Sequence, residues 1–94
     1  MKASIRQKLE KGEQRFDEIR HLLSDPEVLG NLQKFRDLSV EYARLQPTAD
    51  AFAEYRRLER ELAAAQALTQ DADPAMRELG ATEVELVQLS LIHI

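Results

Sequence analysis

Paired carboxylates are the residues whose types and spacing come nearest to a chemical site. Glu13 and Asp17, and Asp37 and Glu41, are four residues apart, so each pair lies on one face of a helix. A pair of this kind is able to hold a divalent cation. Like-charged pairs are also common on solvated helices, and this is the interpretation that we favour. We therefore predict no metal site and no cofactor.

Nucleophilic and phosphate chemistry have no motif in this sequence. It contains no cysteine, no G-x-S-x-G element, no phosphate-binding glycine loop and no G-x-G-x-x-G element. The two histidines, His21 and His93, belong to no metal-binding motif, and we interpret His21 as a surface residue near the end of a helix. We predict that the chain is not an enzyme and binds no small-molecule ligand.

Basic side chains are the remaining candidates, because they can contact the phosphates of RNA. Residues 1–20 hold six Lys or Arg against four Asp or Glu, whereas residues 61–94 hold one against six. No face is basic enough to predict general DNA binding. A solvated helix surface is the alternative to a contact surface. The candidate contacts with RNA or a protein partner are Arg6, Lys8, Lys11, Arg15, Arg56, Arg57 and Arg60.

Helices must position these side chains. Hydrophobic residues make up 44% of the chain, charged residues 32% and aromatic residues only 5%, which is typical of an all-α protein. Apolar residues recur at helical spacing and predict helices over residues 4–23, 26–45 and 49–69, with a fourth from residue 74. The inner face of the second helix is expected to comprise Val28, Leu32, Phe35, Leu38, Tyr42 and Leu45.

Three breaks divide the predicted helices. Asp25 with Pro26, and Asp73 with Pro74, combine an N-cap residue with proline at the first helical position. Pro47 and Thr48 are interpreted in the same way, as the end of one helix and the cap of the next. Gly30 and Asn31 favour fraying or a kink. Since the loops are short, we predict an antiparallel hairpin or bundle of three long helices plus an incomplete fourth.

Apolar residues of the first helix follow a heptad pattern. The pattern comprises Ile5, Leu9, Gly12, Phe16, Ile19 and Leu23. It supports an alternative function, a stand-alone coiled-coil or hairpin interaction module. We expect Gly12 to weaken the helix rather than to admit a neighbouring backbone, and Gly80 to weaken the fourth helix. The five aromatic residues are expected to share one core.

The last six residues differ from the rest of the chain. Residues 89–94 read LSLIHI and carry no acidic residue, lysine or arginine. We predict a domain over residues 1–88 and interpret 89–94 as an atypical apolar tail that is not native to it. No apolar run reaches the roughly 18 residues that a membrane helix requires. The first residues do not form a signal peptide either, so a cytoplasmic protein is expected.

Four sequence blocks in order give the chain a family resemblance. They are MKASIRQKLE at the start, LLSDPEV over residues 22–28, KFRDLSVEYARL over 34–45 and DADPAMRELG over 71–80. Together they resemble the N-terminal part of bacterial class I peptide chain release factors, and specifically the type that reads UAA and UAG. Val40 departs from the family, which usually has a basic residue there, and Gly80 replaces a usual alanine.

The resemblance implies a role in translation termination. It suggests the helical N-terminal domain, which in the family docks near the stalk base of the large ribosomal subunit and meets the recycling GTPase. The family's catalytic Gly-Gly-Gln loop and its codon-reading Pro-x-Thr tripeptide are absent from these residues. Codon reading and peptidyl-tRNA hydrolysis therefore cannot reside in this segment.

Overall fold

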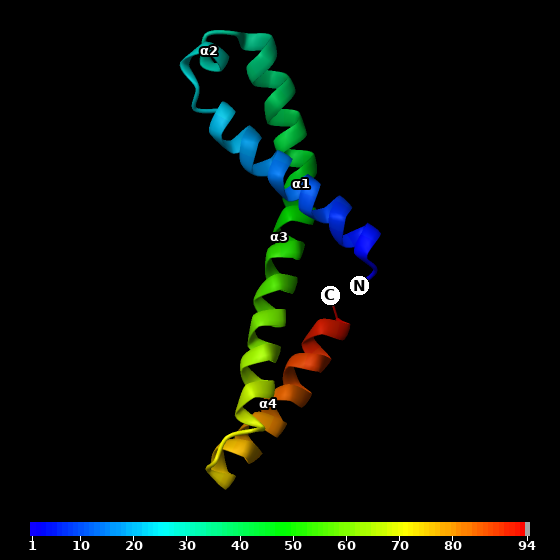
Figure 1. The fold of residues 1–94 in the computed structure, drawn as a ribbon. Helices are drawn as coiled ribbons and strands as arrows, with labels where there is room; N and C mark the ends of the chain where they lie inside the picture. The colour runs from blue at the N-terminus through cyan, green and yellow to red at the C-terminus, as the bar shows by residue number, and fades with distance from the viewer. Residues whose placement is uncertain (94) are drawn as a thin grey trace. The chain divides into compact units, whose positions relative to one another are not determined.

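Four helices make up the protein in a computed structural model that describes residues 1–93. They are α1 (Ala3–Leu22), α2 (Pro26–Leu29), α3 (Leu32–Leu68) and α4 (Pro74–Ile92), as Figure 1 shows. No strand occurs within residues 1–93, so the predicted all-α class is confirmed. The helices form two compact units, Met1–Phe52 and a second unit from Ala53 onward, and α3 contributes to both.

Two aspartates begin helices as predicted. The Asp25 side chain accepts a hydrogen bond of 2.8 Å from the Glu27 N–H at the start of α2. The Asp73 side chain accepts one of 2.9 Å from the Ala75 N–H at the start of α4. Each is followed by proline, which needs no hydrogen-bond partner at the first helical position. These local signals fix two helix starts without any help from tertiary packing.

Gly30 and Asn31 separate α2 from α3. The predicted helix over residues 26–45 is therefore wrong in its first part, although the kink is found where it was expected. Asn31 then starts α3, because its side-chain oxygen accepts a 3.1 Å hydrogen bond from the Lys34 N–H. Leu32 and Phe35, predicted to face inward, are 62% and 36% exposed.

Pro47 lies inside α3 and does not end it. The predicted break at Pro47 and Thr48 is wrong, since α3 runs without interruption from Leu32 to Leu68. Proline removes the hydrogen bond to the carbonyl four residues earlier, here that of Ala43. Ala43 and Pro47 are both exposed, so water can solvate the freed carbonyl. Burial of Ala49 and Phe52 just beyond favours continuation of the helix.

The first unit is an antiparallel pairing of α1 with the start of α3. The rings of Phe16 and Tyr42 stack with centroids 4.5 Å apart. Nearer the start of α1, Arg6 lies over the ring of Phe52. Residues earlier in α1 therefore contact residues later in α3, which shows that the two helices are antiparallel. Ile19 is fully buried. The prediction of one core for all five aromatics is wrong, because Phe35 is 36% exposed and Tyr55 lies in the second unit.

The second unit is a hairpin of the end of α3 and α4. Its buried residues include Leu58, Ala65, Gly80 and Val87. A Cβ atom at Gly80 would lie 2.7 Å from the Leu68 Cβ and 2.9 Å from the Ala65 carbonyl oxygen. Gly80 therefore admits close approach of the two helices, a role that was not predicted. Gly12 has no neighbour within 4 Å of such a Cβ, in agreement with the prediction.

The apolar tail continues α4 as far as Ile92. Leu89 and Ile92 are 56% and 75% exposed, so these two side chains contribute little to packing. His93 forms the C-cap, and its N–H donates to the Ser90 carbonyl. Residue 94 lies outside the described residues. None of the helices within residues 1–93 is long and apolar enough to cross a membrane.

Candidate interaction surface

Arg15 forms hydrogen bonds with two carboxylates of the first unit. Its guanidinium donates hydrogen bonds of 2.8 and 2.9 Å to the Glu41 carboxylate of α3, and one of 3.0 Å to Glu18 on its own helix. The hydrogen bonds from Arg15 lower the pKa of Glu41, and the same contact raises the pKa of Arg15. Arg15 therefore links α1 to α3, and its charge is already matched by two carboxylates.

Arg6 also serves packing in the first unit. Its guanidinium carbon lies 5.6 Å from the centroid of the Phe52 ring, at a distance suited to a cation–π contact. Its Nε atom lies 3.3 Å from a carboxylate oxygen of Glu10, one turn further along α1. Of the four basic candidates on α1, Arg6 and Arg15 thus have partners inside the unit.

Lys8 and Lys11 are the two candidates on α1 that face solvent. Both are exposed, and neither forms an ion pair within the part of the chain that the structure describes. They are three residues apart and so adjoin on the helix surface. Lys11 also borders a shallow polar depression with Gln7, Glu10 and Gln14. We refer to Lys8 and Lys11 as the lysine pair.

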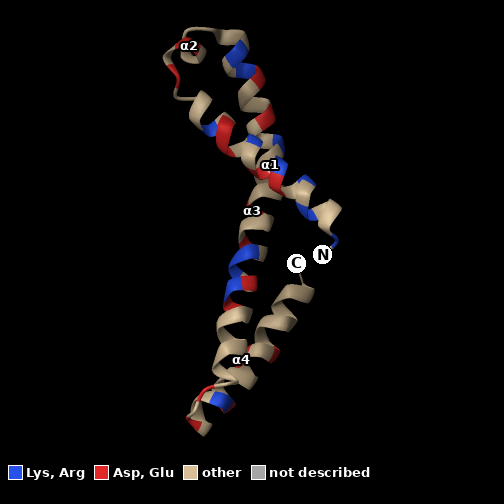
Figure 2. Cartoon of the chain, viewed as in Figure 1, with Lys and Arg blue, Asp and Glu red and all other residues tan. Residues whose placement is uncertain are grey.

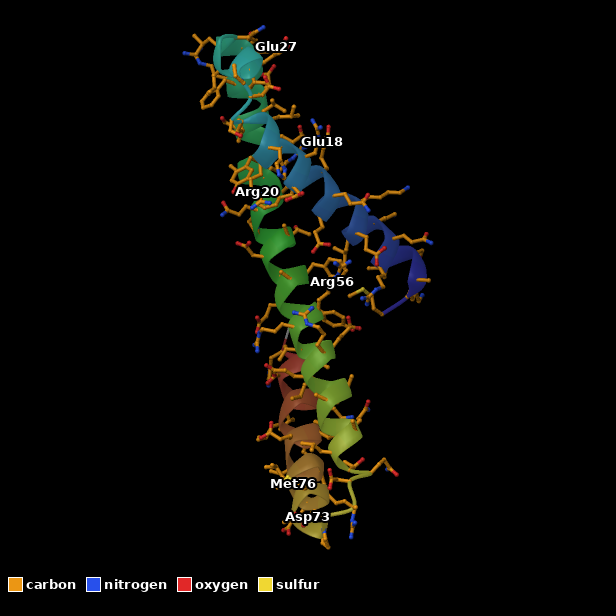
Figure 3. All side chains as sticks on the ribbon, turned by 60° about the vertical axis from the view of Figure 1, so that its left-hand side comes forward. Glu18, Arg20, Glu27, Arg56, Asp73 and Met76 are labelled. Carbon is orange, nitrogen blue, oxygen red and sulfur yellow. The ribbon has the colours of Figure 1, made fainter. Side chains whose placement is uncertain are left out.

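The three candidate arginines on α3 also differ in whether they have partners within the chain. Arg57 donates hydrogen bonds to the carboxylates of Glu54 and Glu61, which raises the pKa of Arg57 and lowers that of Glu54. Arg56, labelled in Figure 3, is half-buried. Arg60 is exposed and has no ion pair among residues 1–93. Figure 2 shows the charged residues of both signs along α3.

Three of the four carboxylates in the predicted pairs contact arginine or glutamine side chains. Asp17 pairs with Arg20 at 2.6 Å, Glu41 with Arg15, and Asp37 accepts a hydrogen bond from Gln33. In residues 1–93, no group of three or more potential ligands is arranged to hold a metal ion. The exposed His21 ring contacts the Asp17 carbonyl oxygen at 2.8 Å, near the end of α1.

A groove between α3 and α4 was not predicted from the sequence. It lies wholly within the second unit and is lined by Glu61, Ala64, Ala65, Leu68, Leu79 and Glu83. Its floor is apolar and its two carboxylates stand on opposite helices. The sequence did contain two signals, the small residues of the LAAAQAL run and the acidic excess after residue 60. Neither shows by itself that the helices leave a groove.

Comparison with known protein families shows the family to which the chain belongs. A family model described as the PCRF domain matches residues 12–93, which is most of the sequence. No solved structure matches the chain. The matched range includes all of α2, α3 and α4 and the second half of α1. The chain therefore belongs to the PCRF domain family, is of the peptide chain release factor type, and has a role in translation termination.

Proposed function

We propose that this chain is the N-terminal docking domain of a UAA/UAG-reading peptide chain release factor. Its task is to hold the factor on the large ribosomal subunit near the stalk base and to meet the recycling GTPase. The family match carries this proposal. The order of the four sequence blocks supports both the N-terminal position and the UAA/UAG type.

The lysine pair is the part of the surface that we assign to ribosomal RNA. Exposed cations without an internal partner can pair with phosphates at no cost to the fold, and Lys8 and Lys11 meet this condition. Arg6 and Arg15 would have to give up contacts with Phe52 and Glu41. Arg60 is a lesser candidate because the basic residues one turn before it on α3, Arg56 and Arg57, have partners of their own.

Co-sedimentation with 70S ribosomes tests this function. We expect the 94-residue chain to pellet with ribosomes at low salt and to be released as salt rises, because phosphate contacts release counterions. The double variant Lys8→Glu, Lys11→Glu should bind at least about tenfold more weakly, since each phosphate contact is replaced by repulsion.

The matched control is Lys34→Glu. Lys34 is also an exposed cation of the first unit, and it lies at the start of α3. It should leave binding nearly unchanged. Lys34→Glu changes the net charge by two units and reversal of the lysine pair by four, so a loss of binding free energy half as large with Lys34→Glu would mean that only net charge matters. Absence of ribosome binding by the unaltered chain would overturn the docking role.

The reading type is tested by the gene itself. If the reading frame of this chain continues as we propose, sequencing beyond the codon for residue 94 will reveal a Pro-x-Thr tripeptide and a Gly-Gly-Gln loop. A continuation with the loop but without the tripeptide would exclude the UAA/UAG type while leaving a release factor. A continuation with neither would contradict the release-factor proposal.

The alternative of a self-associating coiled coil relies on the heptad pattern of α1. In the structure, part of that pattern packs inside the first unit: Ile19 is fully buried and Phe16 stacks on Tyr42. Ile5, at 49% exposure, is the member of the pattern most open to solvent. Analytical ultracentrifugation separates the two functions, because a tight dimer favours the coiled coil and a monomer favours the docking domain.

A further inference from the structure

The groove of the second unit has the shape of a site for one or two apolar side chains. Ala64, Ala65 and Leu68 of α3 form one wall, and Leu79 of α4 forms the other. The small alanine side chains leave the space, while Gly80 brings the two helices close beneath it. Leu79 is 46% exposed, so apolar surface remains uncovered here.

The apolar surface extends along α4 beyond the groove. Leu79, Glu83 and Leu86 are spaced four and three residues apart, which places them along one side of the helix. Leu86 is 54% exposed. Contacts to such a row are typical of a partner helix, whose own side chains repeat at the same spacing. Since the groove is open to solvent along its length, it does not enclose a small molecule.

The charge around the groove selects the partner. Glu83 is exposed and has no ion pair among residues 1–93. On the opposite wall Glu61 shares Arg57 with Glu54, so these three side chains carry one net negative charge.

Residues 61–94 contain six acidic residues and one basic residue, Arg77. Arg77 donates to the Asp71 and Ala72 carbonyls at the loop. Figure 2 shows no blue residue on the second half of α4.

This combination disfavours nucleic acid and favours a basic protein segment. Phosphates would be repelled by Glu83 and by the acidic surroundings, and an apolar floor offers them no donor. A lysine or arginine beside Glu83 would gain an ion pair, while a neighbouring leucine or isoleucine would bury the exposed part of Leu79.

We propose that the groove binds a basic amphipathic helix of a protein partner. Apolar side chains of the partner cover Ala64, Leu68 and Leu79, and its lysines or arginines pair with Glu83 and Glu61. The groove is separate from the lysine pair, so one unit of the chain contacts RNA and the other contacts protein. The proposal does not depend on ribosome binding, and failure of the ribosome test leaves it standing.

A synthetic peptide provides the probe. It has about 14 residues, long enough for helix formation on binding, with leucines along one face and lysines on the other. NMR titration of the 94-residue chain should give saturable shifts at residues 61–68 and 79–83. An analogue with glutamate for each lysine, and another with serine for each leucine, should bind much more weakly.

Two matched pairs of variants locate the site. Glu83→Lys should weaken peptide binding about three- to tenfold, because an attractive contact becomes repulsive. Glu85→Lys makes the same change of charge on α4 outside the groove and should have little effect. Ala64→Gln should fill the groove and weaken binding, whereas Ala63→Gln, at an exposed position outside the groove lining, should not.

The outcomes that overturn the proposal are equally definite. Equal effects of Glu83→Lys and Glu85→Lys would show attraction to net charge rather than to the groove. Absence of saturable shifts at residues 61–68 and 79–83 would show that a basic helix is not recognised. Stronger shifts at these residues with a single-stranded RNA oligonucleotide would assign the groove to nucleic acid. Circular dichroism of each variant confirms that the fold is retained.

Discussion

Arg15 and Glu41 are residues whose contact joins distant parts of the sequence. Because Arg15 lowers the pKa of Glu41 in the folded chain, the folded state binds fewer protons at this group than the unfolded state. The stabilisation is present above the unfolded pKa of a glutamate, about 4.3, and is lost as pH falls through the lower folded value.

Urea unfolding of Glu41→Gln at several pH values checks this contact. We expect the variant to be modestly less stable than the unaltered chain near neutral pH, and the difference to shrink as the medium becomes more acidic than the folded pKa. Asp50→Asn is the control, since Asp50 is exposed on α3 and has no such partner among residues 1–93. A difference that stays constant with pH would contradict the proposed ion pair.

Gly80 and Gly12 form a second test at the residue scale. A Cβ atom at Gly80 would meet backbone at 2.8 and 2.9 Å, so Gly80→Ala should destabilise the chain by about 1–3 kcal/mol through overpacking. Gly12 has open space, so Gly12→Ala should stabilise α1 by about 0.5–1 kcal/mol. Urea unfolding measures both, and stabilisation by Gly80→Ala would show that the helices are further apart.

The side-chain contacts that could be predicted from the sequence are those between residues close together in the chain. Asp25 and Asp73 act on N–H groups two residues away, so their capping role needs no knowledge of the fold. The contact of Arg15 with Glu41 spans 26 positions and was not predictable from helical spacing. Arg6 and Arg15 were predicted as contacts to a binding partner for the same reason. The sequence could not show that Arg6 lies over Phe52 and that Arg15 binds Glu41.

At the scale of elements, replacement of Pro47 tests whether α3 is one continuous helix. Replacing Pro47 with alanine restores an N–H group and removes the clash with the preceding turn. If α3 is continuous, Pro47→Ala should leave the helical circular dichroism signal nearly unchanged and raise stability by as much as about 3 kcal/mol. A large gain of helical signal would instead indicate that the native helix is broken at this residue.

The helix boundaries show which elements follow from local sequence. The breaks at Asp25 and Asp73 combine a cap with a proline at the next position, whereas Pro47 is preceded by glutamine and the expected cap, Thr48, follows it. Pro47 and Thr48 therefore gave the wrong boundary, because burial of Ala49 and Phe52 supports a continuous helix. The break at Gly30 and Asn31 was expected only as fraying or a kink, and Leu32 and Phe35 beyond it are exposed instead of facing inward.

For the whole molecule, the apolar tail is open to a direct test. Leu89 and Ile92 are exposed and Leu91 is half-buried, so deleting residues 89–94 should change the melting temperature and the helix content only slightly. Aggregation should decrease, because exposed apolar surface is removed. Light scattering and thermal unfolding measure the two effects. A large fall in melting temperature would mean that the tail packs as part of the domain.

The division of charge over the molecule unites the two proposals. The unpaired lysines lie in the first unit, whereas the acidic groove lies in the second. Composition alone gave this asymmetry, since the acidic excess is concentrated after residue 60. It did not show which cations remain available or that α3 and α4 leave a groove, because both depend on contacts between helices.

Competition with an intact release factor tests the central claim most directly. Peptide release from ribosomes halted at a UAA codon is measured while the 94-residue chain is added in increasing excess. The docking role predicts that the chain slows release by a UAA/UAG-reading factor, and that reversal of Lys8 and Lys11 abolishes the inhibition while Lys34→Glu does not. Unchanged release rates at chain concentrations that saturate the ribosome would contradict it.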